Sequence, residues 1–225
     1  MNLLKQFIDF FLHIDKNLAI IIQNYGILSY GILFLIIFVE TGLVIFPFLP
    51  GDSMLFAAGA LAANGSFNFL LLWILMGIAA VLGDTVNYWI GHFIGEKAFE
   101  PHHEITFGRF KIKLSKIFKP KYLKKSQDFY DKYGGKAIIL ARFVPIVRTF
   151  APFIAGVSKM SYKKFISFNF IGGWLWVSLF LTAGYLFDNI PLVRNNFEIV
   201  ALGIVGVSLL PILFEFLKAK VVATK

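Results

Sequence analysis

The sequence has no cysteine among its 225 residues. Disulfide frameworks, iron–sulfur clusters and thiolate zinc sites are therefore excluded. Charged residues are also scarce, at 16%, whereas 58% of the residues are hydrophobic and 27 are phenylalanine. With a mean hydropathy of +0.74, this composition indicates an integral membrane protein, and the length suits a single membrane domain over residues 1–225.

The start of the chain lacks the features of a secretory signal peptide. Asp9, His13 and Asp15 interrupt any apolar core, and no cleavage site of small residues follows. Acidic residues are the minority among the charges, 13 against 22 basic ones, which gives a net charge of +9. On a membrane protein, clustered Lys and Arg indicate the cytoplasmic face and anionic headgroups, so we expect no nucleic acid partner.

Half of the basic residues, 11 of 22, fall within residues 95–136, where only five are acidic. The positive-inside bias predicts that this connecting segment is cytoplasmic. Within it, Pro120 to Tyr133 has the pattern of an interfacial amphipathic helix, and residues 1–24 show the same pattern at the start of the chain.

The remaining apolar runs predict an all-α polytopic protein with about three full membrane spans. The runs at about 67–94, 165–187 and 198–216 are each long enough to cross a bilayer as a helix. Three crossings would place the N-terminus outside and the C-terminus in the cytoplasm.

One apolar run, at about 27–63, is broken in its middle by Pro47-Phe-Leu-Pro50-Gly51. Proline ends a helix at about the preceding residue, and glycine allows the chain to reverse. We interpret this run as a re-entrant helical hairpin. Its non-helical backbone must then be covered by protein or line a wet cavity.

A second broken run, at about 137–157, contains Pro145 and Pro152 and is too short to span twice. We interpret it as a second re-entrant hairpin. Because one full span separates the two hairpins, they would enter the membrane from opposite faces. Residues 1–94 and 137–187 then form an inverted repeat, which is the pattern of a transporter whose site lies at the repeat interface.

Five charged residues fall within these apolar segments: Glu40, Asp52, Asp84, Arg142 and Arg148. An ionised side chain at this depth is costly unless it is paired or wet, so each is a functional-site hypothesis by default. The two arginines are separated by about 240° around a straight helix. A bend at the proline between them would bring both onto one cavity.

Two arginines beside a helix N-terminus make a candidate phosphate site. Arginine stays charged and holds phosphate through two parallel hydrogen bonds. The positive ends of helices that begin near Thr149 and Asp52 also favour anions. The alternative is that Arg142 and Arg148 only neutralise Glu40 and Asp52 as structural ion pairs.

The acidic residues have alternative interpretations as well. Glu40 is a candidate proton carrier, because small rearrangements around a buried carboxyl change its protonation. Asp52 follows Pro-Gly directly, which is also the pattern of a helix N-cap. Asp84 and Tyr88 are one helical turn apart, so a hydrogen-bonded structural pair is an alternative to a role in transport.

No metal ion or cofactor is expected. His102 and His103 are adjacent in the sequence, and neighbouring side chains diverge on a strand or a helix. The four tryptophans are interpreted as interface anchors or packing residues rather than ligand contacts. They are Trp73, Trp89, Trp174 and Trp176.

Four motifs stand out in the broken hairpins and the span between them. They are Glu40 with Phe46-Pro47-Phe-Leu-Pro50-Gly51-Asp52, Gly83-Asp84-x-x-x-Tyr88-x-x-Gly91, Arg142-Phe143-x-Pro145-x-x-Arg148-Thr149, and Ala155-Gly156-x-Ser158-x-Met160. These motifs resemble those of the bacterial DedA family, within the wider group of SNARE-associated, or VTT-domain, membrane proteins. The resemblance runs from about Tyr25 to Asp188. Asn87 departs from it, because a glycine is usual before the tyrosine, and this bears only on the packing of that span.

The resemblance implies a protein of the bacterial cytoplasmic (inner) membrane with two opposed re-entrant hairpins. It implies that Glu40 and Asp52 are the essential acidic pair and that Arg142 and Arg148 are the essential arginines. Bacterial members are linked to the return of undecaprenyl phosphate across the cytoplasmic membrane and depend on the proton-motive force. Eukaryotic relatives scramble phospholipids.

The expected function is therefore a flippase for a polyprenyl-phosphate carrier lipid, coupled to protons, rather than an enzyme. A nonspecific phospholipid scramblase and a proton/cation antiporter stay open as alternatives. A membrane phosphatase is the enzyme alternative, but the hairpins contain no histidine and the only hydroxyls near the arginines are those of Ser53 and Thr149. The expected partners are the lipid substrate, protons and membrane lipids, and a homo-oligomer stays open.

Overall fold

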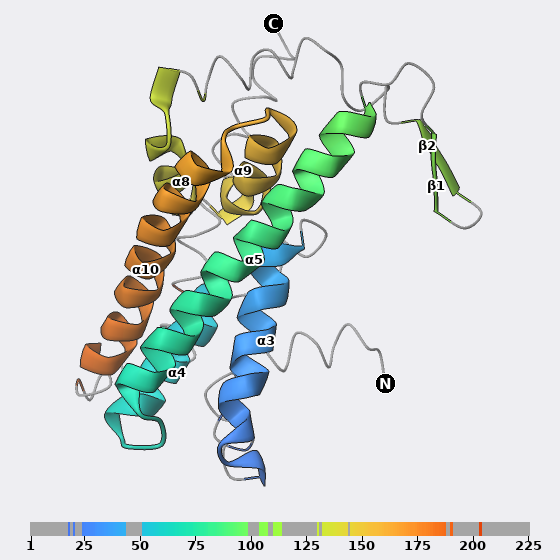
Figure 1. Cartoon of the computed structure of the whole chain (residues 1–225). Helices are drawn as coiled ribbons and strands as arrows, with labels where there is room; N and C mark the ends of the chain where they lie inside the picture. The colour runs from blue at the N-terminus through green and yellow to red at the C-terminus, as the bar shows by residue number, and fades with distance from the viewer. Residues whose placement is uncertain are drawn as a thin grey trace, which may run out of the picture.

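The computed structural model describes a group of helices and one short β-hairpin (Figure 1). The described residues are 18, 20, 24–43, 51–98, 104–107, 110–113, 130, 132–143, 145–187, 190 and 203. The helices are α3 (Leu28–Gly42), α4 (Gly51–Ala63), α5 (Phe69–Ala98), α8 (Lys136–Ala141), α9 (Pro145–Val157) and α10 (Tyr162–Phe187). The antiparallel strands are β1 (Glu104–Phe107) and β2 (Phe110–Lys113).

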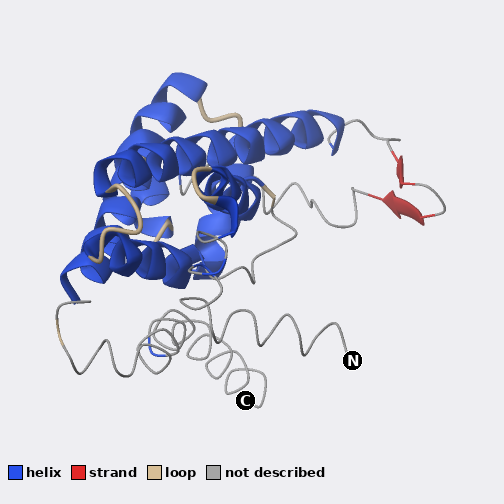
Figure 2. Cartoon of the chain, turned by 90° about the horizontal axis from the view of Figure 1, so that it is seen from below, coloured by secondary structure: helices blue, strands red, loops and turns tan. Residues whose placement is uncertain are grey.

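The described part of the chain is helical, as the sequence predicts, except for this β-hairpin, which the sequence analysis did not predict. The hairpin lies to one side of the helices in both Figure 1 and Figure 2. Several predicted features fall wholly or almost wholly outside the described residues. They are the amphipathic helices at 1–24 and 120–133, the break from Pro47 to Pro50, and the third span at 198–216.

Two helices, α5 and α10, are long and apolar enough to cross a bilayer. Each carries a stretch of 26 residues that qualifies, Phe69–Ile94 and Tyr162–Phe187. Only 39% and 33% of their most apolar windows are buried, so most of this apolar surface faces outward. A core helix of a soluble protein would be mostly buried, whereas a helix in contact with lipid tails exposes apolar side chains.

The four shorter helices are arranged as two opposed pairs along α5 and α10, which run in opposite directions (Figure 1). Helices α3 and α4 occupy the lower half of this view, and α8 and α9 occupy the upper half. The end of α3, the start of α4 and the start of α9 therefore approach one another near the middle of the long helices. This is the arrangement expected of an inverted repeat.

The second helix of each pair packs mainly on the long helix of the other half. Helix α4 packs against α10, and α9 packs against α5, whereas α3 and α8 pack against the long helix of their own half. Glycines allow the exchanged contacts to be close. A Cβ atom at Gly59 or Gly184 would collide with backbone across the α4–α10 contact, and one at Gly91 or Gly156 would do so across the α5–α9 contact.

These contacts define two structural units, which we call unit A (α4, α8 and α10) and unit B (α3, α5 and α9). Each unit contains one long helix, the first short helix of the same half and the second short helix of the other half. The two units meet chiefly where α5 packs against α10.

The two prolines of the second half have different effects on the helix. Helix α9 begins at Pro145, where the missing N–H costs nothing because the first helical position has no intrahelical acceptor. The predicted start near Thr149 is therefore wrong by one turn. Helix α9 also continues through Pro152, so this second proline removes one hydrogen bond without ending the helix.

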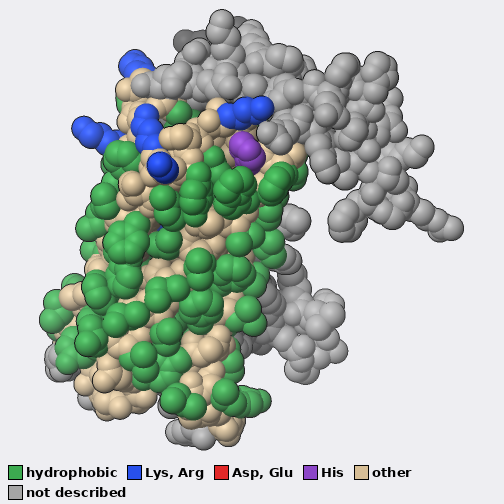
Figure 3. Space-filling model, in the orientation of Figure 1, with side chains coloured by type: hydrophobic (Ala, Val, Ile, Leu, Met, Phe, Trp, Pro, Cys, Tyr) green, Lys and Arg blue, Asp and Glu red, His purple; other side chains and the backbone are tan. Residues whose placement is uncertain are grey.

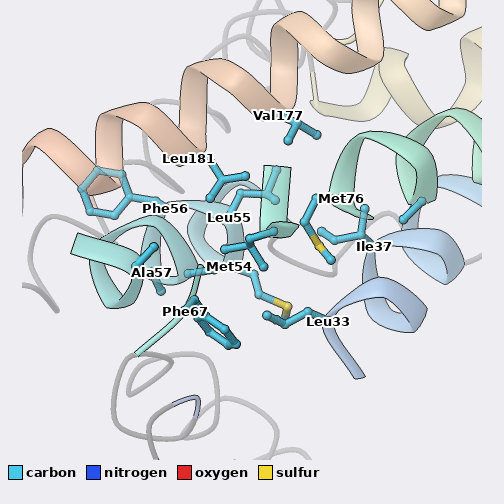
Figure 4. Packing of buried hydrophobic residues seen from close by; sticks show 14 of the residues in the cluster. Leu33, Ile37, Met54, Leu55, Phe56, Ala57, Phe67, Met76, Val177 and Leu181 are labelled. Carbon is cyan, nitrogen blue, oxygen red and sulfur yellow. The ribbon is translucent and has the colours of Figure 1, made fainter. Parts of the chain in front are cut away.

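The main apolar core lies in the half of the molecule that contains α3 and α4. It joins side chains of α3, α4, α5 and α10 around Met54 and Leu55 (Figure 4). A smaller cluster around Tyr88 and Phe165 lies between α5, α9 and α10. Each core is built from residues of both halves, so neither half buries its apolar side chains alone.

Basic side chains gather at one end of the described molecule, seen at the top of Figure 3. The described turn regions at the opposite end, residues 24–30 and 62–70, contain no charged residue. The exposed lysines at the basic end lie around α8 and the α9–α10 turn. They are Lys132, Lys136, Lys159, Lys163 and Lys164.

Candidate functional site

The candidate site lies where the ends of the short helices meet the middle of the two long helices. A small cavity there is lined by Thr41, Asp84, Arg142, Arg148, Thr149 and Trp176. Its free space has room for about one water molecule. The sequence-predicted arginines therefore line a single cavity, although a straight helix would point them apart.

Arg148, in the first turn of α9, bridges the two helices of the first pair. Its Nη1 donates to Oδ1 of Asp52 at the start of α4 over 2.7 Å. Its Nη2 donates to Oε1 of Glu40 near the end of α3. The side chains of Arg148, Glu40 and Asp52 are only 10%, 1% and 13% exposed, so one guanidinium and two carboxylates share a nearly water-free site.

Glu40 also caps the N-terminus of α4. The backbone N–H of Gly51 donates to Glu40 Oε1 over 3.1 Å, which satisfies one of the N–H groups that a helix start leaves without an intrahelical acceptor. A Cβ atom on residue 51 would collide with the Glu40 carboxylate, so glycine is required for this approach. The alternative that Asp52 acts only as a helix cap is wrong, since its carboxylate pairs with Arg148.

Arg142 forms a second buried cluster beside that of Arg148, Glu40 and Asp52. Its Nη2 donates to Oδ2 of Asp84 on α5 and to Oδ1 of Asn169 on α10, the latter over 2.5 Å. Asn169 is itself held by a 3.1 Å bond from its Nδ2 to the Val81 carbonyl. Nε of Arg142 is buried and has no hydrogen-bond partner among the described residues. The second arginine thus keeps one donor available inside the protein.

The structure separates two residues that the sequence analysis considered as a pair. Asp84 accepts from Arg142, whereas the Tyr88 hydroxyl donates to the backbone carbonyl of Met160, after α9. The predicted hydrogen bond between Asp84 and Tyr88 is therefore wrong. Tyr88 instead links α5 to the α9–α10 turn.

Asn87, noted in the sequence only as a departure, joins both helix pairs to α5. Its Nδ2 donates to the carbonyl of Thr41 over 3.2 Å and to the carbonyl of Thr149 over 2.8 Å. The Thr41 carbonyl belongs to the last turn of α3, where carbonyls lack intrahelical donors. Asn87 is fully buried, and sequence position alone gave no sign of this contact.

Trp176 is a second residue of the site whose polar contacts were not predicted from the sequence. It is 1% exposed, and its Nε1 donates to Asp52 Oδ1 over 2.8 Å. The guanidinium carbon of Arg148 lies 5.0 Å from the centre of its ring, a cation–π distance. Trp176 is therefore a packing residue of the core, as one of the two interpretations expected, but it also contacts two charged residues of the site.

The other predicted site residues are placed as follows. Pro145 is the first residue of α9, and the Thr149 side chain is buried beside the cavity. Pro47 and Pro50 lie outside the described residues, as do His102 and His103. Within the described ranges, no group of three or more His, Cys, Asp or Glu side chains is placed to hold a metal ion.

Comparison with known proteins supports the resemblance. The VTT domain family model matches residues 49–186. Protein DedA of Escherichia coli strain K12 is 51% identical over 227 residues, covering 100% of this chain and 99% of its own. No solved structure matches the chain.

More distant relatives are also named as membrane proteins. The uncharacterized membrane protein ML0287 of Mycobacterium leprae is 46% identical, covering 79% of this chain and 75% of its own. The inner membrane protein YghB of E. coli K12 is 32% identical over 85% of each chain. Together with the apolar helices and the motifs that form the buried cluster, these matches show that the chain is a membrane protein that belongs to the DedA family of VTT-domain proteins.

Proposed function

We propose that this protein is a membrane transporter for a lipid phosphate, and specifically a flippase that returns a polyprenyl phosphate such as undecaprenyl phosphate to the cytoplasmic leaflet. One observation carries the proposal: Arg148, from one helix pair, bridges Glu40 and Asp52 of the opposed pair in a buried site. Ionic groups inside a membrane protein mark substrate or ion pathways, and arginine is suited to phosphate.

The proposed placement puts α5 and α10 across the bilayer and makes the α3–α4 and α8–α9 pairs re-entrant hairpins. The lysines at the end near the α9–α10 turn favour the cytoplasm for that end. The charged cluster then lies near mid-depth, where a transporter needs access from either side in turn. The lipid tail would stay in the bilayer while the headgroup passes between the units.

In this mechanism a phosphate replaces carboxylates as the partner of the arginines. Removing the partner of a buried charge is costly, by about 3–5 kcal/mol. A phosphate monoester offers several oxygens in bidentate geometry, so both guanidiniums stay paired when the carboxylates are displaced. The free Nε of Arg142 is an additional donor for this exchange.

The charges of the described cluster explain why protons would accompany the lipid. Three carboxylates face two guanidiniums, so the fully ionised empty site has one negative charge in excess. A phosphate monoester adds about −1.5 to −2 at neutral pH. Because uncompensated charge is costly at this depth, displaced carboxylates other than Asp52, which keeps the Trp176 N–H as a donor, must take up protons, and inward proton flow would then favour inward movement of the headgroup.

The two units suggest how access alternates. Arg148 of unit B pairs with Asp52 of unit A, and Arg142 of unit A pairs with Asp84 of unit B. Both ion pairs therefore cross the interface between the units, with the arginine on unit B in one pair and on unit A in the other. We infer that rocking of unit A against unit B breaks both pairs, and that the bound phosphate replaces the bridge that they provide.

The test is lipid translocation in proteoliposomes that contain the full chain. Fluorescent polyprenyl phosphate and a phosphatidylcholine are compared, with and without a pH gradient, for the native protein, Arg148→Ala and the control Lys164→Ala. Selective, gradient-stimulated movement that is lost only in Arg148→Ala is expected. Equal, gradient-independent movement of both lipids would indicate a scramblase and refute the flippase.

A proton/cation antiporter is the second candidate, and the excess carboxylate favours it. It would appear as cation-dependent dissipation of the pH gradient in vesicles without polyprenyl phosphate. That result, combined with no lipid movement, would replace the proposed function.

A further inference from the structure

One face of helix α10 lies toward the two arginines. It is formed by residues at helical spacing, Asn169, Gly172, Gly173 and Trp176. Asn169 holds Arg142, and the two glycines leave room for the Arg142 side chain. We propose that Trp176 is a positioning residue for lipid-phosphate transport. The face of its indole ring holds the Arg148 guanidinium in place, and its N–H stays bonded to Asp52 when phosphate replaces Asp52 as the partner of Arg148. This inference rests on the proposed function.

Trp176 makes two different polar contacts at once. The N–H edge of the ring donates to Asp52 Oδ1, the same oxygen that accepts from Arg148 Nη1. The face of the ring lies against the guanidinium of Arg148. A residue that only filled space would need neither contact, and phenylalanine would serve as well.

The two contacts have separate consequences for the exchange. When phosphate takes the Arg148 N–H groups, Asp52 loses the arginine as a donor but keeps the indole N–H. The ring face attracts the cation regardless of which anion is bound, so the guanidinium stays in place as its partner changes. Since Arg148 no longer shares Asp52 in the occupied site, the indole N–H contributes more there than in the empty site, and Trp176 therefore lowers the free energy of the phosphate-bound state relative to the empty one.

This difference predicts an effect on substrate affinity. Trp176→Phe removes one donor from Asp52 in both states, but Arg148 still pairs with that carboxylate in the empty site and no longer does so in the occupied site. The apparent KM for polyprenyl phosphate should rise about tenfold, the effect of one buried hydrogen bond to a charged group. Trp176→Leu also removes the ring face, which holds the cation in both states, so it should lower stability further while its KM stays close to that of Trp176→Phe. The maximal rate per folded molecule should change less than KM in Trp176→Phe.

Trp73 provides a matched control. Its Nε1 donates to Ser178 Oγ over 2.7 Å, so this indole bond also joins α5 to α10, but neither residue lines the cavity. Trp73→Phe should leave KM at the native value. An equal rise of KM in Trp73→Phe and Trp176→Phe would mean that only helix packing is affected, and would overturn the proposal.

A fluorescence experiment tests the contact between Arg148 and the Trp176 ring without relying on transport. In a variant with Trp73, Trp89 and Trp174 replaced by phenylalanine, the remaining emission comes from Trp176. Arg148→Ala should shift that emission, and native-like elution in size-exclusion chromatography checks that the variant is folded. An unchanged emission would overturn the proposed positioning of Arg148.

The two experiments separate the possible failures. Failure of the native protein to move polyprenyl phosphate would refute the proposed function and, with it, the transport role of Trp176. The emission shift would then still decide whether Trp176 holds Arg148 in place. Native transport with an unchanged KM in Trp176→Phe would refute the positioning role alone.

Discussion

Replacing Arg148 with lysine tests whether the site depends on the fork of the guanidinium or only on its charge. Two separate nitrogens of Arg148 reach two carboxylates, on Asp52 and Glu40. A lysine ammonium is a point charge on a flexible stem, so it should keep one of these partners and lose the other. The lost bond to a buried charged group is worth about 1.5–3 kcal/mol. In the proposed mechanism, lysine also lacks the second parallel hydrogen bond to the bound phosphate. A lost bond of the same size would reduce transport by about 10- to 150-fold.

The same substitution should lower the unfolding free energy by about 1.5–3 kcal/mol, because one carboxylate remains buried with a lost partner. Adding Glu40→Gln should restore much of that stability, since a neutral amide needs no cation and its carbonyl oxygen can still accept the Gly51 N–H. Thermal unfolding in detergent measures stability, and the proteoliposome assay measures transport. Native transport in Arg148→Lys would refute the reasoning from two-nitrogen geometry.

Three further substitutions test other parts of the structure by thermal unfolding. Gly184→Ala should lower the unfolding free energy by about 1–3 kcal/mol, because the added Cβ would meet the backbone of α4. The control Gly31→Ala, whose Cβ would have nothing within 4 Å, should be neutral or stabilising. Equal effects would argue against the close α4–α10 contact. Lys159→Gly should raise the unfolding free energy by about 0.5–1 kcal/mol. Lys159 has φ 56°, a left-handed conformation that is strained for every residue except glycine. A loss of stability would show that the side-chain contacts of Lys159 outweigh this strain. Gly51→Ala should impair transport and stability together, because a methyl group there displaces the Glu40 carboxylate; a fully active variant would contradict the observed capping of α4.

The sequence predicted five charges in apolar segments and, as one alternative, that both arginines pair with Glu40 and Asp52. This pairing is observed for Arg148, whereas Arg142 pairs with Asp84. Apolar surroundings identify Glu40, Asp52, Asp84, Arg142 and Arg148, because a charge in such a segment is conspicuous. Their pairing depends on which short helix packs on which long helix. Since α9 packs on α5 while α8 packs on α10, Arg148 meets the first helix pair and Arg142 meets α5. No local pattern contains that information.

The polar partners of the arginines were harder to predict. A tryptophan in a membrane helix is usually an interface anchor, and Trp176 became a site residue only because α4 brings Asp52 against it. The spacing of Asn169, Gly172 and Trp176 on one face of α10 was a usable signal. The β-hairpin also left a signal, because Phe110 to Lys113 alternates apolar and basic residues with a period of two.

In the proposed transport cycle, the exchange of short helices between the halves would set the free-energy barrier to opening the empty site. Because each arginine pairs with an acid of the other unit, separating the units breaks two buried pairs in one movement. Arg148 keeps Glu40 of its own unit, but Arg142 would lose Asp84 at a cost of about 3–5 kcal/mol, so the empty protein would open only rarely, which limits proton leakage. In the proposed mechanism, a phosphate that pairs with the released guanidinium removes most of this cost, so the ion pairs that hold the empty site closed would make its opening depend on the substrate.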